Sequence, residues 1–210
     1  MPSIIASNTQ KPFKQVPAGC HFALCNMVVD LGWQKSEWQG QTRHVHQVYI
    51  RWEVPDERVV YEKDGEPIEG PCSIGRTYTL ALTPRAHLRK DLENWRGKAF
   101  TAEEEKSFDI ATVGGKCCQL MVTHKEGGER TYANITGVIG LTKEQLTRAK
   151  TARSEVGVLV FSLVDPDQQV LQKLPKWIQE KLENRVVTSV PAQAWPGSEN
   201  EEEFDDDLPF

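Results

Sequence analysis

The alternation of side chains along residues 43–54 constrains the fold more than any other feature of the sequence. Val48, Ile50 and Trp52 occupy every second position there and suit a protein core, whereas charged and polar side chains occupy most positions between them. Successive side chains of a strand point to opposite faces. The pattern therefore predicts a β-strand with one buried face and one open face.

Four further segments have the apolar and β-branched composition of strands: residues 19–30, 76–82, 116–124 and 130–138. The last two are joined through Gly127 and Gly128, which supply the positive φ angles that a tight hairpin requires. The residues between 55 and 73 include several prolines and glycines and predict a long loop or an irregular hairpin.

A helix is expected between the third and fourth predicted strands. Thr83 followed by Pro84 favours a helix start, because the hydroxyl can cap and proline suits the first turn, and Gly97 favours the end. Thr101 and Glu104 have the spacing of a capping box, which predicts a second short helix.

The order strand, strand, strand, helix, strand, strand is that of an OB-fold, a five-stranded Greek-key barrel, although other α+β domains share it. We therefore expect a mainly β protein with an OB-fold domain over residues 17–140, preceded by a flexible arm at residues 1–16. The helix lies between strands three and four of this barrel.

A C-terminal appendage follows. Residues 141–187 are expected to contain a linker or solvated helix, an apolar strand at 156–164, and amphipathic helices packed on the barrel, with Pro175 starting the second helical piece. A separate partner-binding helix is the alternative. Residues 188–210 combine prolines with an acidic run and predict a disordered tail.

Charge is distributed unevenly along the chain. The net charge is −5, but seven acidic residues lie among the last fourteen, and leaving them out gives the remainder a charge of +2. A mildly basic body with an acidic tail is the asymmetry expected when the body binds a polyanion and the tail binds a basic partner.

The cysteines and the terminal sequence point to the cytoplasm. The five cysteines include no C-x-x-C pair, which favours reduced thiols acting as small buried hydrophobic groups over a disulfide framework or a metal site. The longest apolar run is too short to cross a bilayer, and no secretion signal is evident. We expect a cytoplasmic protein, in the bacterial host if phage-encoded, without membrane, metal or cofactor.

The last ten residues, E-E-E-F-D-D-D-L-P-F, resemble the acidic C-terminal tip of bacterial single-stranded DNA-binding proteins. The body looks more like the divergent single-stranded DNA-binding proteins of tailed phages, which combine an OB-fold with an acidic tail. The resemblance implies that the tip binds host or phage replication, recombination and repair proteins. The tip residues are Asp205, Asp206, Asp207, Leu208, Pro209 and Phe210.

The chemistry of the tip favours the same role. The ring of Phe210 can enter an apolar pocket, its α-carboxylate can meet a cation, and the three aspartates can meet a basic rim.

Binding a single strand without reading its sequence needs cations for the phosphates and aromatic faces for the bases. Trp33, Lys35 and Trp38 are predicted to lie in the loop between the first two strands. The other candidates lie on strands two and three and on the last hairpin, and a core role is the alternative for the tyrosine of strand three. They are Arg43, Tyr49, Arg51, Arg76, Tyr78, Lys125, Arg130 and Tyr132.

These patterns predict a non-sequence-specific single-stranded DNA-binding protein that acts in DNA replication, recombination or repair. The alternatives are a DNA-processing enzyme, such as a nuclease or recombination enzyme, and a protein-binding adaptor, each with the same recruiting tail. The sequence contains neither a G-x-x-x-x-G-K nor an H-E-x-x-H motif, which favours a protein that is not an enzyme.

Overall fold

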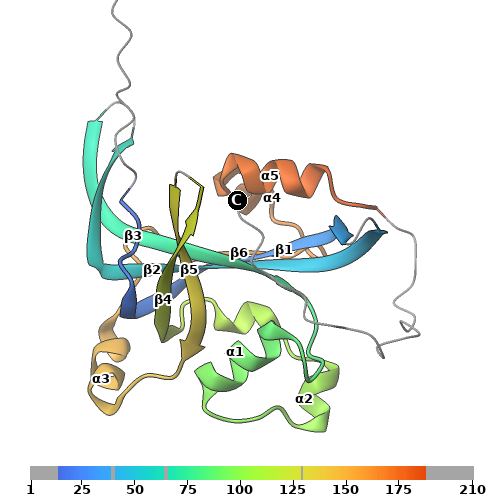
Figure 1. The fold of residues 1–210 in the computed structure, drawn as a ribbon, viewed down its shortest axis with the longest axis horizontal. Coiled ribbons are helices and arrows are strands. Elements are labelled where there is room, and N and C mark those ends of the chain that lie inside the picture. Colours follow the sequence, from blue (N-terminus) through green and yellow to red (C-terminus); the bar gives the residue numbers. More distant parts are fainter. Residues whose placement is uncertain (1–13, 39–40, 64–65, 129, 188–210) are drawn as a thin grey trace, which may run out of the picture.

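The computed structural model describes residues 14–38, 41–63, 66–128 and 130–187. These residues form one antiparallel sheet in the order β3-β2-β1-β4-β5, with β6 added to β1 in parallel (Figure 1). The prediction of a mainly β protein is confirmed. The strands are β1 (Gly19–Trp38), β2 (Gln41–Lys63), β3 (Glu66–Thr79), β4 (Cys117–Gly127), β5 (Arg130–Ile139) and β6 (Leu159–Phe161).

Helices lie on two sides of this sheet. In Figure 1, α1 and α2 lie below it, and α4 and α5 lie above it. The helices are α1 (His87–Arg96), α2 (Ala102–Lys106), the 3-10 helix η1 (Ile110–Val113), α3 (Lys143–Thr151), α4 (Gln168–Lys173) and α5 (Lys176–Glu183). No described helix is long and apolar enough to span a bilayer.

The ends of these helices follow the sequence signals with one exception. Gly97 terminates α1 with a φ of +68°, and Thr101 forms the predicted capping box with Glu104. The predicted start at Thr83 is wrong, because the Thr83 carbonyl closes a turn with the Ala86 amide and α1 begins only at His87.

The first three strands are longer than predicted. The segment containing Trp33 was expected to be a loop, but it is part of β1, where Trp33 pairs with His46 and Trp38 with Gln41. Residues 55–73 form the irregular hairpin, with a register shift between Val54 and Arg58. Antiparallel pairing with a neighbour stabilises these polar segments as strands despite their local composition.

The sheet is buried on both faces. The predicted core side chains Val48, Ile50 and Trp52 lie in a first core, which also contains Leu88 and Leu92 of α1. The cysteines Cys25, Cys72 and Cys118 are buried in this core, as expected for small hydrophobic groups. The same expectation is wrong for Cys20, which is exposed, and holds only in part for Cys117, which is half-buried.

A second core lies on the opposite face of β1 and β2. Met27, Val29 and Tyr49 pack there against Ile178 and Leu182 of α5. The C-terminal amphipathic helices therefore cover a face of the sheet that would otherwise be open.

Polar contacts also tie the C-terminal segment to the sheet. The buried Glu53 carboxylate accepts hydrogen bonds from the Ser154 hydroxyl at 2.6 Å and from the Glu155 amide at 3.0 Å. Arg148 of α3 donates two 2.7 Å hydrogen bonds to Asp56, and its guanidinium lies over the Phe22 ring.

A buried tyrosine joins β3 to α1. Tyr78 is 1% exposed, and its hydroxyl donates a 2.9 Å hydrogen bond to the buried Asp91. Burial, together with the nearby Asp91 carboxylate, raises the pKa of Tyr78 well above its ordinary value. The phenol therefore stays protonated and remains a donor.

Replacing Tyr78 by Phe should destabilise the protein by about 1–3 kcal/mol, because the buried Asp91 carboxylate loses the hydrogen bond from the hydroxyl. The matched control is Tyr61→Phe, since Tyr61 is 40% exposed and should change the free energy of unfolding little. Urea denaturation of both variants measures the difference. Equal stability of the two variants would contradict the assigned role of the hydroxyl.

Candidate nucleic-acid interface

The end of the β1–β2 ribbon presents an aromatic ring to solvent. Trp33 is 41% exposed, and its ring lies 5.4 Å from the His46 ring at an interplanar angle of 36°. Lys35 pairs with His44 in the same register, so it shares a face with Trp33. Lys35 also forms a 3.2 Å ion pair with Glu37.

The Asp30 carboxylate holds the His46 ring in place. The His46 Nε2 lies 2.7 Å from the Asp30 carboxylate. Burial raises the pKa of Asp30, but hydrogen bonds from His46 and from the Gly32 amide outweigh it, and the pKa lies below its ordinary value. Asp30 therefore orients His46, against which Trp33 packs.

The β4–β5 hairpin presents a second pair of predicted residues. Lys125 lies directly opposite Tyr132, so the two side chains share a face. Lys125 is exposed and Tyr132 is half-buried. The hairpin is fastened to the N-terminal segment, since His124 Nε2 lies 2.8 Å from the Val16 carbonyl.

Two predicted aromatic residues are wrong as base-stacking groups. Tyr49 is 8% exposed because Trp177 of α5 covers it, with ring centroids 4.9 Å apart at 89°. Tyr78 belongs to the first core, so the alternative of a core role is correct. Neither ring can stack on a base in this arrangement.

Three predicted cations of strands β2 and β3 have different surroundings. The half-buried Arg51 donates a 3.0 Å hydrogen bond to Asn26, and burial lowers its pKa. Arg76 donates a 3.2 Å hydrogen bond to the Ile135 carbonyl and lies 3.5 Å from Asp91. Arg43 is half-buried opposite Ser36, on the other face of the ribbon from Lys35. Arg51 and Arg76 therefore have structural partners.

Sequence reasoning missed a residue of α5. Trp177 is 37% exposed, and the Lys181 ammonium lies 5.9 Å from the centre of its ring. The amphipathic spacing of residues 170–182 assigned Trp177 to a core. Only the packing of α5 across β1 and β2 leaves one side of its ring open.

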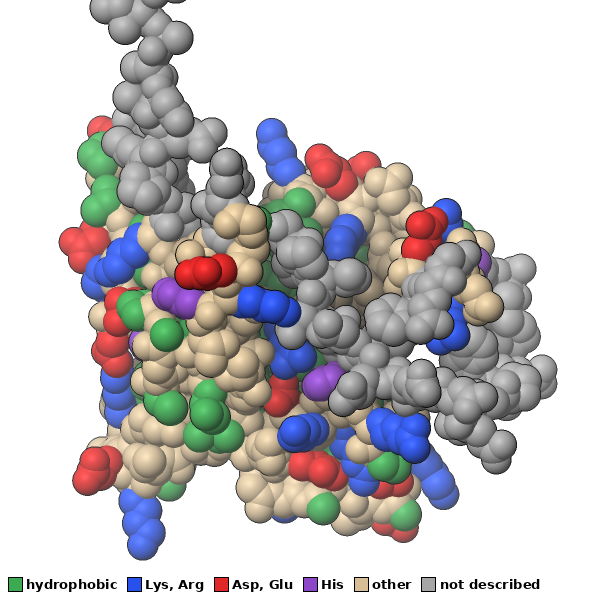
Figure 2. Space-filling model, viewed as in Figure 1, with side chains coloured by type: hydrophobic (Ala, Val, Ile, Leu, Met, Phe, Trp, Pro, Cys, Tyr) green, Lys and Arg blue, Asp and Glu red, His purple; other side chains and the backbone are tan. Residues whose placement is uncertain are grey.

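The predicted residues thus form two exposed groups, one on each hairpin. Over α1 and α2, Figure 2 shows cations and acids side by side, as in the ion pairs of Arg89 with Glu93 and Glu105. The side chains of Trp38 and Arg130, and all of Asp205–Phe210, lie outside the described residues.

The described residues contain no group of three His, Cys, Asp or Glu side chains that could hold a metal ion. No known protein family matches this chain, and no curated protein matches its sequence. The function is therefore inferred from the geometry and chemistry of the residues.

Replacing Asp30 by Asn should destabilise the protein by about 1 kcal/mol at pH 6, because the amide oxygen can still accept both hydrogen bonds but lacks the charge that strengthens them. Because the pKa of Asp30 is lower in the folded protein than in the unfolded chain, its carboxylate stabilises the fold at pH values above the unfolded pKa of about 3.9. This stabilisation disappears as the pH falls through the pKa of the folded state. The difference in free energy of unfolding between the wild type and the variant should therefore become smaller towards pH 3. Denaturation curves at pH 6 and pH 3 test this, and an unchanged difference would contradict it.

Proposed function

We propose that this protein has an OB-fold, binds single-stranded DNA without reading its sequence, and recruits DNA-processing proteins through residues 205–210. The observation that carries the proposal is the strand order β3-β2-β1-β4-β5 with α1 between β3 and β4. An OB-fold barrel has this order and closes where its third and fifth strands meet.

Contacts between β3 and β5 support such a closure. The two strands lie close together, and the Arg76 side chain of β3 donates to the Ile135 carbonyl of β5. All five strands from β1 to β5 contribute side chains to the first core. A partly open barrel of this kind needs no backbone hydrogen bonds between its third and fifth strands.

The exposed groups lie where an OB-fold binds oligonucleotides. That fold uses the connection between strands one and two and the connection between strands four and five. Here the strand ends beside these connections carry Trp33 with Lys35, and Lys125 with Tyr132. Each pair offers an aromatic face for a base and a cation for a phosphate.

Trp177 offers a further stacking ring, on the face of β2 opposite to the one that carries His46 and Trp33. The face of strands two and three is the remaining binding surface of an OB-fold, and Tyr49 lies on it beneath Trp177. We assign to Trp177, beside Lys181, the stacking role that the sequence suggested for Tyr49. The appendage would then supply part of the DNA-binding surface rather than block it.

Oligo(dT) should bind with an affinity that falls with salt, at a logarithmic slope of about −0.7 per phosphate neutralised. Trp33→Ala and Tyr132→Ala should each weaken binding by about 1–3 kcal/mol, roughly 5- to 150-fold, because a base stack is lost. Fluorescence anisotropy with labelled oligo(dT) measures both effects.

Tyr61→Ala is the matched control, since Tyr61 is similarly exposed but lies on the β2–β3 hairpin. It should bind oligo(dT) like the wild type. Absence of binding would favour the adaptor alternative, and cleavage of the oligonucleotide with added magnesium would favour an enzyme. Normal binding by both test variants would place the DNA elsewhere.

Phe210→Ala should abolish capture of partner proteins while leaving oligo(dT) affinity nearly constant, because it removes the anchoring ring and keeps every acid. Phe204→Ala changes the same residue type within the same acidic segment and should retain capture. Pull-down from bacterial lysate, beside the oligo(dT) titration, measures both properties. Equal capture by the two variants would contradict docking through residues 205–210.

A further inference from the structure

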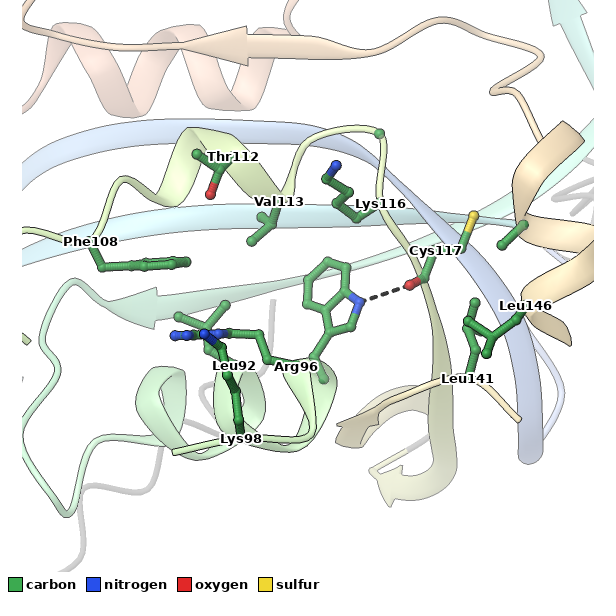
Figure 3. Close-up of a pocket in the computed structure, with 13 residues that line it drawn as sticks. Leu92, Arg96, Lys98, Phe108, Thr112, Val113, Lys116, Cys117, Leu141 and Leu146 are labelled. Carbon is green, nitrogen blue, oxygen red and sulfur yellow. Dashed lines mark hydrogen bonds between the residues drawn. The ribbon is translucent and has the colours of Figure 1, made fainter. Parts of the chain in front are cut away.

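A groove lies at the end of the sheet opposite the two hairpin ends (Figures 1 and 3). It has a volume of about 630 Å³ and is formed by α1, η1, the start of β4 and α3. β4 begins at the groove with Cys117 and ends at the β4–β5 turn with Gly127. At about 3.3 Å per residue, the groove and the hairpin end are roughly 30 Å apart. The groove is therefore separate from the proposed DNA surface.

The walls of the groove are mainly apolar. Trp95 is held as part of the wall, because its indole N–H donates a 2.8 Å hydrogen bond to the Cys117 carbonyl. Leu146 is half-exposed on α3, and Figure 3 shows it on the far side of the groove from Phe108. The apolar lining consists of Leu92, Trp95, Phe108, Val113, Leu141 and Leu146.

Three cations line the same groove: Arg96, Lys98 and Lys116. Glu104 forms ion pairs with Arg96 and Lys98, but the buried Nη1 of Arg96 has no hydrogen-bond acceptor within the described residues. Lys116 has no ion pair with any residue that the structure describes. Glu104 therefore pairs with two of these cations and not with Lys116, and an acidic ligand would balance the remaining positive charge.

We propose that residues 204–210 of this same chain, Phe-Asp-Asp-Asp-Leu-Pro-Phe, bind in this groove. Leu208 and Phe210 would contact the apolar walls, and the aspartates would lie near Lys116, Lys98 and Arg96. The groove has a size at which proteins commonly bind small ligands, about 300–1,000 Å³. Both the charge and the apolar character of the segment are complementary to it.

The connecting chain is long enough for this placement. The segment between Val187 and Phe204 can span at most about 50–60 Å when extended. A folded domain of this size has a radius of gyration of about 16 Å. Tethering keeps the segment at a high effective concentration near the groove, so even weak individual contacts suffice.

Binding of residues 204–210 in the groove would limit the recruitment of partner proteins and would leave DNA binding unaffected. A protein that captures residues 205–210 must first draw them from the groove, whereas DNA on the hairpins need not displace them. This inference extends the proposed function without depending on it, since groove occupancy does not require that the protein bind DNA.

Photo-crosslinking in the full chain tests the proposal. Phe210 is replaced by p-benzoylphenylalanine, which keeps an aromatic ring, and cross-linked peptides are mapped by mass spectrometry. We expect adducts on α1, on residues 113–117 and on α3. Leu146→Asp or Lys116→Glu should each lower the yield by about fivefold or more. Adding Asp206→Lys to Lys116→Glu should restore it.

The matched control is Lys143→Glu, an exposed cation of α3 that does not line the groove and should keep the yield. Saturating oligo(dT) should also leave the cross-link unchanged. Cross-links on the β1–β2 or β4–β5 hairpin, cross-links only between two copies, or yields unaffected by both groove variants would each overturn the proposal. Failure to bind oligo(dT) with an intact cross-link would overturn only the proposed function.

Discussion

The hydrogen bonding of β1 holds the described structure together. This strand pairs with β4 over Gly19–Leu24, with β2 over Leu24–Trp38, and with β6 over Met27–Val29. One edge of β1 pairs first with β4 and then with β6. Between these two pairings, the register of β1 against β2 shifts between Cys25 and Met27. A bulge of this kind bends a strand and increases its twist. β1 can therefore contribute to the first core at one end and to the second core at the other.

Two buried faces follow from this arrangement. The side chains that β2 contributes to the first core occupy every second position of the strand, and this alternation is why Val48, Ile50 and Trp52 were recognised. The second core forms only because α4, α5 and β6 return to the face that the alternation left open. Residues 154 and 155 lie directly against the sheet, because the Ser154 hydroxyl and the Glu155 amide donate hydrogen bonds to the buried Glu53 carboxylate.

The exposed functional groups lie at opposite ends of the sheet. Aromatic and cationic side chains lie near the hairpin ends, whereas the basic and apolar groove lies between α1 and α3. This separation would let one small domain hold a nucleic acid and an acidic peptide at the same time. A strand as long as β4 spans the distance between the two sites.

The sequence by itself determined the elements whose signals are local. Local signals depend on neighbours within a few residues, so they were recognised: strand alternation, the positive φ of Gly128 in the β4–β5 turn, the Gly97 helix end and the Thr101 capping box. The positive φ expected at Gly127 is wrong, because Gly127 is the last paired residue of β4. The acidic segment was also evident, although its role stays a prediction.

Only the tertiary structure decided which aromatic rings remain exposed. Tyr49 and Trp177 are far apart in the chain, and the position of α5 on β2 buries the first and exposes the second. The groove likewise combines α1, β4 and α3, so no single segment of sequence encodes it. The burial of a side chain depends on what packs over it, and here the packing elements come from distant parts of the chain.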